Sequence, residues 1–241
     1  MVLALLGCQR RAELPAMPAA HPALASLPPR MLWAWERAED LRWLPAQVGV
    51  AYVASSILLA GPSAQVRARA NPLYVAATTP LVPVVHVDAS WQQPPTLSEQ
   101  QQAVILAQVL RAARGYRVVQ LDFEVRRSQR AFLQALVARI RQQLPADTAL
   151  SITALASWCS GDYWLANIAA DEIVPMTFRM GPEQEVIRQQ IARDGGFRHA
   201  KCNRAIGYAQ DEARAASKAP RQYYFSPKPW RAESWRQMFA S

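Results

Sequence analysis

The sequence predicts an α/β fold, a (β/α)8 barrel of the TIM type that is short and irregular. Eight short apolar runs of β type recur along the chain, and helical stretches separate most of them. Each run is too uniformly apolar for a strand with one face in solvent, so we expect a parallel sheet that is buried on both faces. A doubly wound open sheet is the alternative, but no glycine-rich phosphate loop follows any run.

The predicted strands are residues 32–36, 48–53, 81–87, 117–123, 150–155, 172–178, 204–209 and 222–225. After the second strand, residues 55–60 and 65–70 are typical of a β-hairpin, which stands where a helix is expected. Helices are predicted at 97–114, at 128–144 with Ser128 as the cap, at 183–193 before Gly195, and at 232–240. The folded domain therefore covers residues 31–241.

The first thirty residues predict a lipid-anchored protein. Leu5-Leu6-Gly7-Cys8 resembles the lipobox of bacterial lipoproteins, which implies that Cys8 carries lipid and that residues 1–8 are the remnant of a signal. The remnant lacks the positive start and long apolar core of a full signal peptide, so we expect the true start upstream, or a clipped chain. Residues 9–30 are rich in Ala and Pro without a period, which indicates a flexible tether.

The lipid would place the protein in the periplasm, and the anchor would be its only link to the membrane. No apolar run reaches the ~18 residues that a membrane span needs. Cys159 and Cys202 then form an even pair in an oxidising compartment and are candidates for a disulfide. Cys159 follows the end of one predicted strand and Cys202 precedes the start of another, so a loop would have to cross the barrel edge.

The basic charge does not predict a nucleic-acid partner. The 241 residues include 27 Lys and Arg against 18 Asp and Glu, a formal net charge of +9. Arginines make up nearly all of the basic residues and are spread along the whole chain, whereas a nucleic-acid footprint is clustered.

Polar residues gather where the predicted strands end, which is where a TIM barrel carries its chemistry. Asp122 and Glu124 share one face of the fourth strand, ~6–7 Å apart, and their repulsion is expected to raise the pKa of one of them. A protonated acid beside an ionised carboxylate is the pairing that glycosidases use. An Asp-x-Glu pair also occurs by chance on exposed strands, but this strand is predicted to be central. We therefore predict Asp122 and Glu124 as the catalytic pair.

The same strand ends supply candidates for substrate binding. Aromatic rings beside carboxylates suit sugars, whose C–H faces stack on rings while their hydroxyls take hydrogen bonds. Arg179 is expected to neutralise Asp122 or Glu124, and the alternative for His86 is a satisfied core histidine. The predicted substrate-binding residues are His86, Asp88, Arg179, Asp211, Trp35, Trp158, Tyr224 and Trp230. We predict no cofactor, and no metal, because the acidic residues and His86 lack a strict ligand spacing.

The segment Val119-Gln-Leu-Asp-Phe-Glu124 resembles the end of the Asp-x-Asp-x-Glu signature of family 18 glycoside hydrolases, the chitinase-like barrels. The resemblance implies that Glu124 is the general acid and that Asp122 orients the N-acetyl group of the substrate. Gln120 stands where the first Asp of the signature belongs, which weakens the proton relay. Phe178 and Arg179 replace the Tyr and Asp of the sixth strand, which disfavours substrate-assisted chitin cleavage.

The chain as a whole is similar to a bacterial lipoprotein-like domain family of unknown function, itself distantly similar to the chitinase-like barrels. The segments that carry this resemblance are Ala156-Ser-Trp-Cys159, residues 175–181 and Asp211-Glu212. The sequence therefore predicts a glycoside-hydrolase-like barrel that acts on a cell-envelope or extracellular polysaccharide. The alternative is a catalytically inert barrel that binds glycans or an envelope protein.

Overall fold

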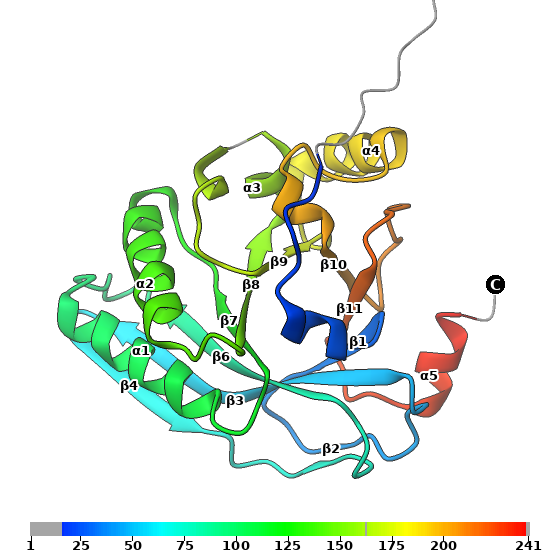
Figure 1. The fold of residues 1–241 in the computed structure, drawn as a ribbon, viewed down its shortest axis with the longest axis horizontal. Coiled ribbons are helices and arrows are strands. Elements are labelled where there is room, and N and C mark those ends of the chain that lie inside the picture. The colour runs from blue at the N-terminus through cyan, green and yellow to red at the C-terminus, as the bar shows by residue number, and fades with distance from the viewer. Residues whose placement is uncertain (1–15, 162, 240–241) are drawn as a thin grey trace, which may run out of the picture.

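The computed structural model describes residues 16–161 and 163–239, so Cys8 and the segment around it lie outside the described residues. Within this part of the chain, eight parallel strands close into a barrel, because β1 pairs with both β3 and β11. The predicted (β/α)8 barrel is confirmed (Figure 1). In order around the barrel, the strands are β1 (Arg30–Ala34), β3 (Val48–Ala60), β6 (Leu81–Ala89), β7 (Val118–Phe123), β8 (Ala149–Leu155), β9 (Glu172–Met176), β10 (Ala205–Ala209) and β11 (Arg221–Phe225).

The helices cover the barrel unevenly. Figure 1 shows α1 and α2 side by side over one flank of the barrel, with α5 on the opposite side. The α1 cap is Ser98, whose hydroxyl accepts from the backbone N–H of Gln101, whereas Ser128, the predicted cap of α2, lies inside a 3-10 turn before that helix. The helices are α1 (Glu99–Ala112), α2 (Arg130–Gln143), α3 (Ala156–Ser160), α4 (Gln184–Asp194) and α5 (Ala232–Gln237).

The predicted hairpin after the second strand is present, but it is an extension of that strand. β3 runs on beyond the barrel and pairs antiparallel with β4 (Ser63–Ala68). The two runs predicted at 48–53 and 55–60 are one strand, with a shift of register against β6 between Val53 and Ser55. A bulge bends a strand without ending it, so the sequence pattern breaks while the strand continues. Before and after this hairpin, the short strands β2 (Glu39–Asp40) and β5 (Leu73–Tyr74) pair with each other.

Two apolar layers hold the barrel together. One fills the interior with alternate side chains of the strands, and the other lies between the strands and the helices. The interior layer also contains Ala23 and Leu24, which lie in the 3-10 turn η1 (Pro22–Ser26), and Leu27, which directly follows that turn. The folded region thus begins earlier than residue 31, because these apolar side chains at the end of the predicted tether cover the N-terminal opening of the barrel.

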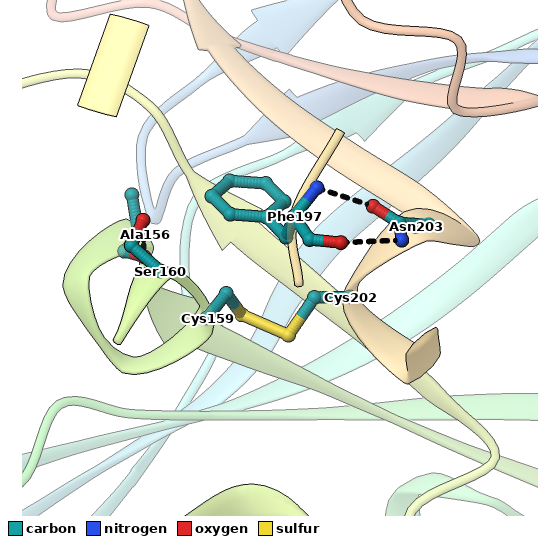
Figure 2. Close-up of a disulfide and its surroundings, with 6 residues drawn as sticks. All are labelled: Ala156, Cys159, Ser160, Phe197, Cys202 and Asn203. Atoms are coloured by element: carbon teal, nitrogen blue, oxygen red, sulfur yellow. Dashed lines mark hydrogen bonds between the residues drawn. A yellow bond between two sulfur atoms is a disulfide. The ribbon is translucent and has the colours of Figure 1, made fainter. Parts of the chain in front are cut away.

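A disulfide joins Cys159 in α3 to Cys202 in the 3-10 turn η5 (Ala200–Asn203), with the Cα atoms 6.0 Å apart (Figure 2). Both α3 and η5 pack against β9, so the loop after β8 and the loop before β10 meet over the strand between them. Asn203 holds the second loop, because its side-chain amide exchanges two hydrogen bonds with the backbone of Phe197. Both cysteines are buried.

Among the described residues, we find no helix that is both long and apolar enough to cross a membrane.

Candidate functional site

A row of polar side chains crosses the mouth of the barrel from β6 to β8. The register of β6 and β7 places His86 opposite Asp122, and His86 Nδ1 lies 2.7 Å from Asp122 Oδ2. Thr153 on β8 donates its hydroxyl hydrogen to Asp122 Oδ1 at 2.5 Å. The other ring nitrogen of His86, Nε2, lies 3.1 Å from Asp88 Oδ2. Both oxygens of Asp122 are therefore occupied by protein partners, and His86 bridges two carboxyl groups.

His86 is a cation at neutral pH in this arrangement. Burial by itself lowers the pKa of the imidazole, but the hydrogen bonds to Asp122 and Asp88, together with the charges of these two groups, outweigh it and raise the pKa to about 10. The hydrogen bond from His86 in turn lowers the pKa of Asp88. His86 therefore donates from both ring nitrogens, which a satisfied core histidine in a neutral setting does not do.

Glu124 differs from its neighbours, because its carboxyl group makes no hydrogen bond or ion pair with any described residue. It lies two residues beyond Asp122 and is exposed at the mouth. Partial desolvation by the surrounding protein raises the pKa of Glu124, and the negative charges of Asp122 and Asp88 raise it further. Glu124 is therefore an exposed carboxyl group at the mouth that has a raised pKa and no bonded partner among the described residues.

A second polar layer lies below the mouth, deeper in the barrel. Gln120 accepts from Trp33 Nε1 at 2.8 Å and donates to Ser151 Oγ at 3.0 Å. Ser151 and Tyr223 each donate to Glu172 Oε2 at 2.8 Å. The other carboxylate oxygen of Glu172 forms an ion pair with Arg221. Gln120, where the signature has an acid, is thus an amide that neutral partners fix on both sides.

An aromatic pocket of about 310 Å³ opens beside the polar row, at the ends of β1, β9, β10 and β11. The edge of Trp35 meets His86 with ring centroids 5.6 Å apart, which joins the pocket to the row. Phe178 and Phe225 lie together with centroids 4.9 Å apart and supply further apolar surface. Aromatic faces beside hydrogen-bonding carboxyl groups are the combination that a sugar ring fits. The residues that line the pocket are Trp35, Arg37, Phe178, Arg179, Ala209, Phe225, Ser226 and Pro227.

Arg179 lines this pocket, but it does not neutralise Asp122 or Glu124 as predicted. Its guanidinium instead contacts Asp211 at 2.6 Å and Glu212 at 2.8 Å. The backbone of Arg179 has φ 48°, a conformation unfavourable for a side-chain-bearing residue, and its N–H donates to Glu212 at 3.1 Å. Arg179 and Asp211 are therefore together at the pocket edge, held partly by Glu212, which was not among the predicted site residues.

Three predicted sugar-binding aromatics lie elsewhere. Trp158, Tyr224 and Trp230 are all buried in the apolar layer outside the strands. Tyr224 lies in β11 between Tyr223 and Phe225, whose side chains point into the barrel. Its own ring therefore points outward, where it packs edge-on with Trp235. Closeness to a strand end thus says little about which side of the sheet a ring occupies.

Thr153 is the residue of the row that the sequence reasoning missed. A signal was available, because Ser151 and Thr153 alternate with apolar residues on the fifth strand and so share its inward face. As for metals, the described side chains of His, Cys, Asp and Glu form no cluster of three or more that could hold an ion.

Comparison with known proteins shows the fold. No protein-family model matches the chain, and no curated protein matches it in sequence. The spore cortex-lytic enzyme SleL of Bacillus cereus superposes with a TM-score of 0.50 and 15% identity, over 75% of this chain and 51% of that one. The chitinase domain of the spore coat protein CotE of Clostridium difficile gives 0.38 and 15%, over 66% and 53%. The chain therefore spans about half the length of these proteins, and it shares the barrel fold of a cortex-lytic enzyme.

Proposed function

We propose that this barrel cleaves a polysaccharide of the cell envelope, with Glu124 as the general acid. The observation that carries the proposal is the state of Glu124, which is exposed at the barrel mouth, has no partner among the described residues and has a raised pKa beside a second carboxyl group. A glycosidic oxygen needs a proton as its bond to the sugar breaks, and an acid of this kind supplies it.

In this proposal Asp122 acts without moving. Its two oxygens are held by His86 and Thr153, so the group presents a fixed charge next to Glu124. A fixed negative charge raises the pKa of Glu124 and stabilises the positive charge that develops on the sugar ring. The ring itself would rest in the pocket against Trp35 and Phe178.

The envelope as the source of the substrate rests on two separate supports. The fold is shared with an enzyme that is named for lysis of the spore cortex. We also propose that the protein is exported and attached to the envelope through lipid on Cys8, on the strength of the Leu5-Leu6-Gly7-Cys8 tetrad. The buried disulfide between Cys159 and Cys202 fits an oxidising compartment. Fractionation of cells and mass spectrometry of residue 8 test the location, and recovery in the cytosol with an unmodified cysteine would refute it.

A catalytically inert barrel that binds a glycan or an envelope protein is the second candidate. It is favoured by Gln120, whose amide cannot pass a proton, and by Asp122, whose two bonds prevent it from turning toward a substrate. Under this candidate the aromatic pocket keeps its role and Glu124 only accepts or donates hydrogen bonds.

The deciding experiment incubates the purified protein with bacterial peptidoglycan, soluble oligomers of N-acetylglucosamine and a set of other envelope polysaccharides. We expect new reducing ends from at least one of them, and weaker binding of the same polysaccharide by Trp35→Ala. Tyr74→Ala is the matched control, because it also removes an exposed aromatic ring, and Tyr74 neither lines the pocket nor belongs to the polar row. Binding without new reducing ends would favour the inert barrel, and the absence of both binding and cleavage would refute the proposed cleavage and the glycan-binding form of the second candidate.

A further inference from the structure

Trp91 is the most exposed large hydrophobic side chain in the described part of the chain, with 79% of its surface open to solvent. It lies in the loop after β6, three residues beyond Asp88. Single exposed hydrophobic residues are common, but a tryptophan that is both exposed and held in place beside a cluster of carboxyl groups calls for an explanation.

Arg126, from the loop after β7, holds the Trp91 ring. Its guanidinium carbon lies 3.4 Å from the ring centroid, a close cation–π contact that links the two loops. The Nη2 atom of Arg126 is shielded from solvent and has no hydrogen-bond partner among the described residues, so the ring itself is the main support of this group. Because the guanidinium covers one face, the exposed surface of Trp91 belongs to its other face and its edge.

The place of this pair relative to the catalytic candidates is defined by the chain. Arg126 follows Glu124 by two residues, and three extended residues from Asp88 place Trp91 within ~11 Å of it, Cα to Cα. The aromatic pocket with Trp35 lies at the ends of β1 and β9 to β11, whereas Trp91 and Arg126 follow β6 and β7. Trp91 and Arg126 therefore extend from the two strands that carry Asp88 and lead to Glu124, and neither of them lines the pocket.

We propose that Trp91 is a second sugar-stacking site, separate from the pocket and beside the segments that carry Asp88 and Glu124. The inference rests on the proposed function and extends it, because two separate stacking sites accommodate a longer stretch of polysaccharide than a single sugar. The ligand class is an oligosaccharide long enough to touch both rings, and Arg126 orients the ring before the sugar arrives, which reduces the entropy lost on binding.

The test measures binding of N-acetylglucosamine oligomers of increasing length, or fragments of the polysaccharide that the protein prefers, by isothermal titration calorimetry. Trp91→Ala should weaken the longest oligomers about tenfold, as expected for loss of a tryptophan anchor, and leave the disaccharide unchanged. Trp35→Ala should weaken all lengths. Arg126→Gln, which keeps Trp91 but removes the cation, should give a smaller loss that is again confined to long oligomers.

Tyr74→Ala again serves as the control. Equal losses by Trp91→Ala at every length, or no loss at any length, would overturn the second stacking site while the proposed function stands. Absence of binding by the unmodified protein to every oligomer and polysaccharide would instead refute the proposed function, and the second site with it.

Discussion

Two polar layers cross the interior of the barrel, and they differ in how completely their carboxyl groups are partnered. In the lower layer Glu172 is fully buried and is bonded to Ser151, Tyr223 and Arg221. In the upper layer Glu124 has no partner among the described residues. A buried carboxylate is stable only when hydrogen-bond or ion-pair partners surround it. A carboxyl group that has to bind a substrate must instead be free of such partners in the protein.

Comparison of the two layers shows that a carboxyl group in a barrel can be assigned to scaffold or to site by its hydrogen bonds. Asp122 stands between the extremes, because it belongs to the upper layer but has both oxygens bonded. In the proposed function it serves the site as a fixed charge. Substitutions in the two layers and in the scaffold around them test this division.

The largest effect is expected from the charge of His86 in the upper layer. The folded state raises the pKa of this group from 6.5 to about 10, so its contribution to stability is complete below pH ~6.5 and is lost as the pH rises toward 10. The wild type should therefore have a higher free energy of unfolding than His86→Phe at low pH. This difference should decrease as the pH rises, by at most about 5 kcal/mol. Urea unfolding at pH 6, 8 and 10 measures it. A difference that does not change with pH would show that His86 is not held as a cation.

Removal of the Glu172 side chain should lower the free energy of unfolding of the protein, whether or not a ligand is present. Glu172→Ala leaves Arg221 buried with no opposite charge, a change that costs about 3–5 kcal/mol of the free energy of unfolding. Glu124→Ala, the matched change in the upper layer, should cost less than about 1 kcal/mol, because no protein partner is lost. Chemical denaturation of the two variants checks the contrast. Similar losses in both would remove the distinction between the layers.

The disulfide over β9 belongs with the scaffold. Replacement of Cys159 and Cys202 together by alanine should lower the free energy of unfolding by about 2–4 kcal/mol, because a closed loop with a sequence separation of 43 opens in the unfolded state. Neither cysteine belongs to the polar row or lines the pocket, so glycan binding below the unfolding temperature should not change. Thermal unfolding of the variant tests the loss of stability, and calorimetric titration of the same sample tests the unchanged binding. A loss of binding by the folded variant would contradict the assignment to the scaffold.

The smallest effect is expected at Thr153, which keeps Asp122 in place. Thr153→Val preserves the shape and removes one hydrogen bond to a charged group, at a cost of about 1.5–3 kcal/mol in stability. Turnover should fall with little change in affinity, since in the proposed function Asp122 acts on the reacting sugar by its charge alone. Kinetic measurements separate kcat from KM. Thr153→Ser, which restores the hydroxyl, should recover both stability and turnover, and failure of this rescue would count against the positioning role.

Much of this organisation was predictable from the sequence. Apolar strands and their order predict the barrel, and the alternation along β7 predicts that Gln120 and Asp122 share its inner face. Alternation works here because the strand is buried on both sides and its register is fixed. The hairpin of β3 and β4 was also predicted, from residues 55–60 and 65–70.

The rest depends on contacts between segments that are distant in the sequence. The sequence around Arg179 does not predict that it pairs with Asp211 and Glu212 rather than with Asp122. This pairing depends on how the loops at the barrel mouth pack against one another. The ring of Tyr224 faces outward because the side of the sheet is set by the position of a residue in the strand alternation and not by its distance to the strand end, and Trp158 lies in α3, where it packs into the same outer layer.

The most direct test of the division between scaffold and site is the turnover of Glu124→Gln on the polysaccharide that the wild type cleaves. The variant keeps the shape of the side chain and removes the proton that it can transfer. We expect turnover to fall ~10²–10⁴-fold, with the dissociation constant and the free energy of unfolding unchanged. Glu99→Gln, at an exposed glutamate of α1, should match the wild type in all three. Undiminished turnover by Glu124→Gln would contradict the account.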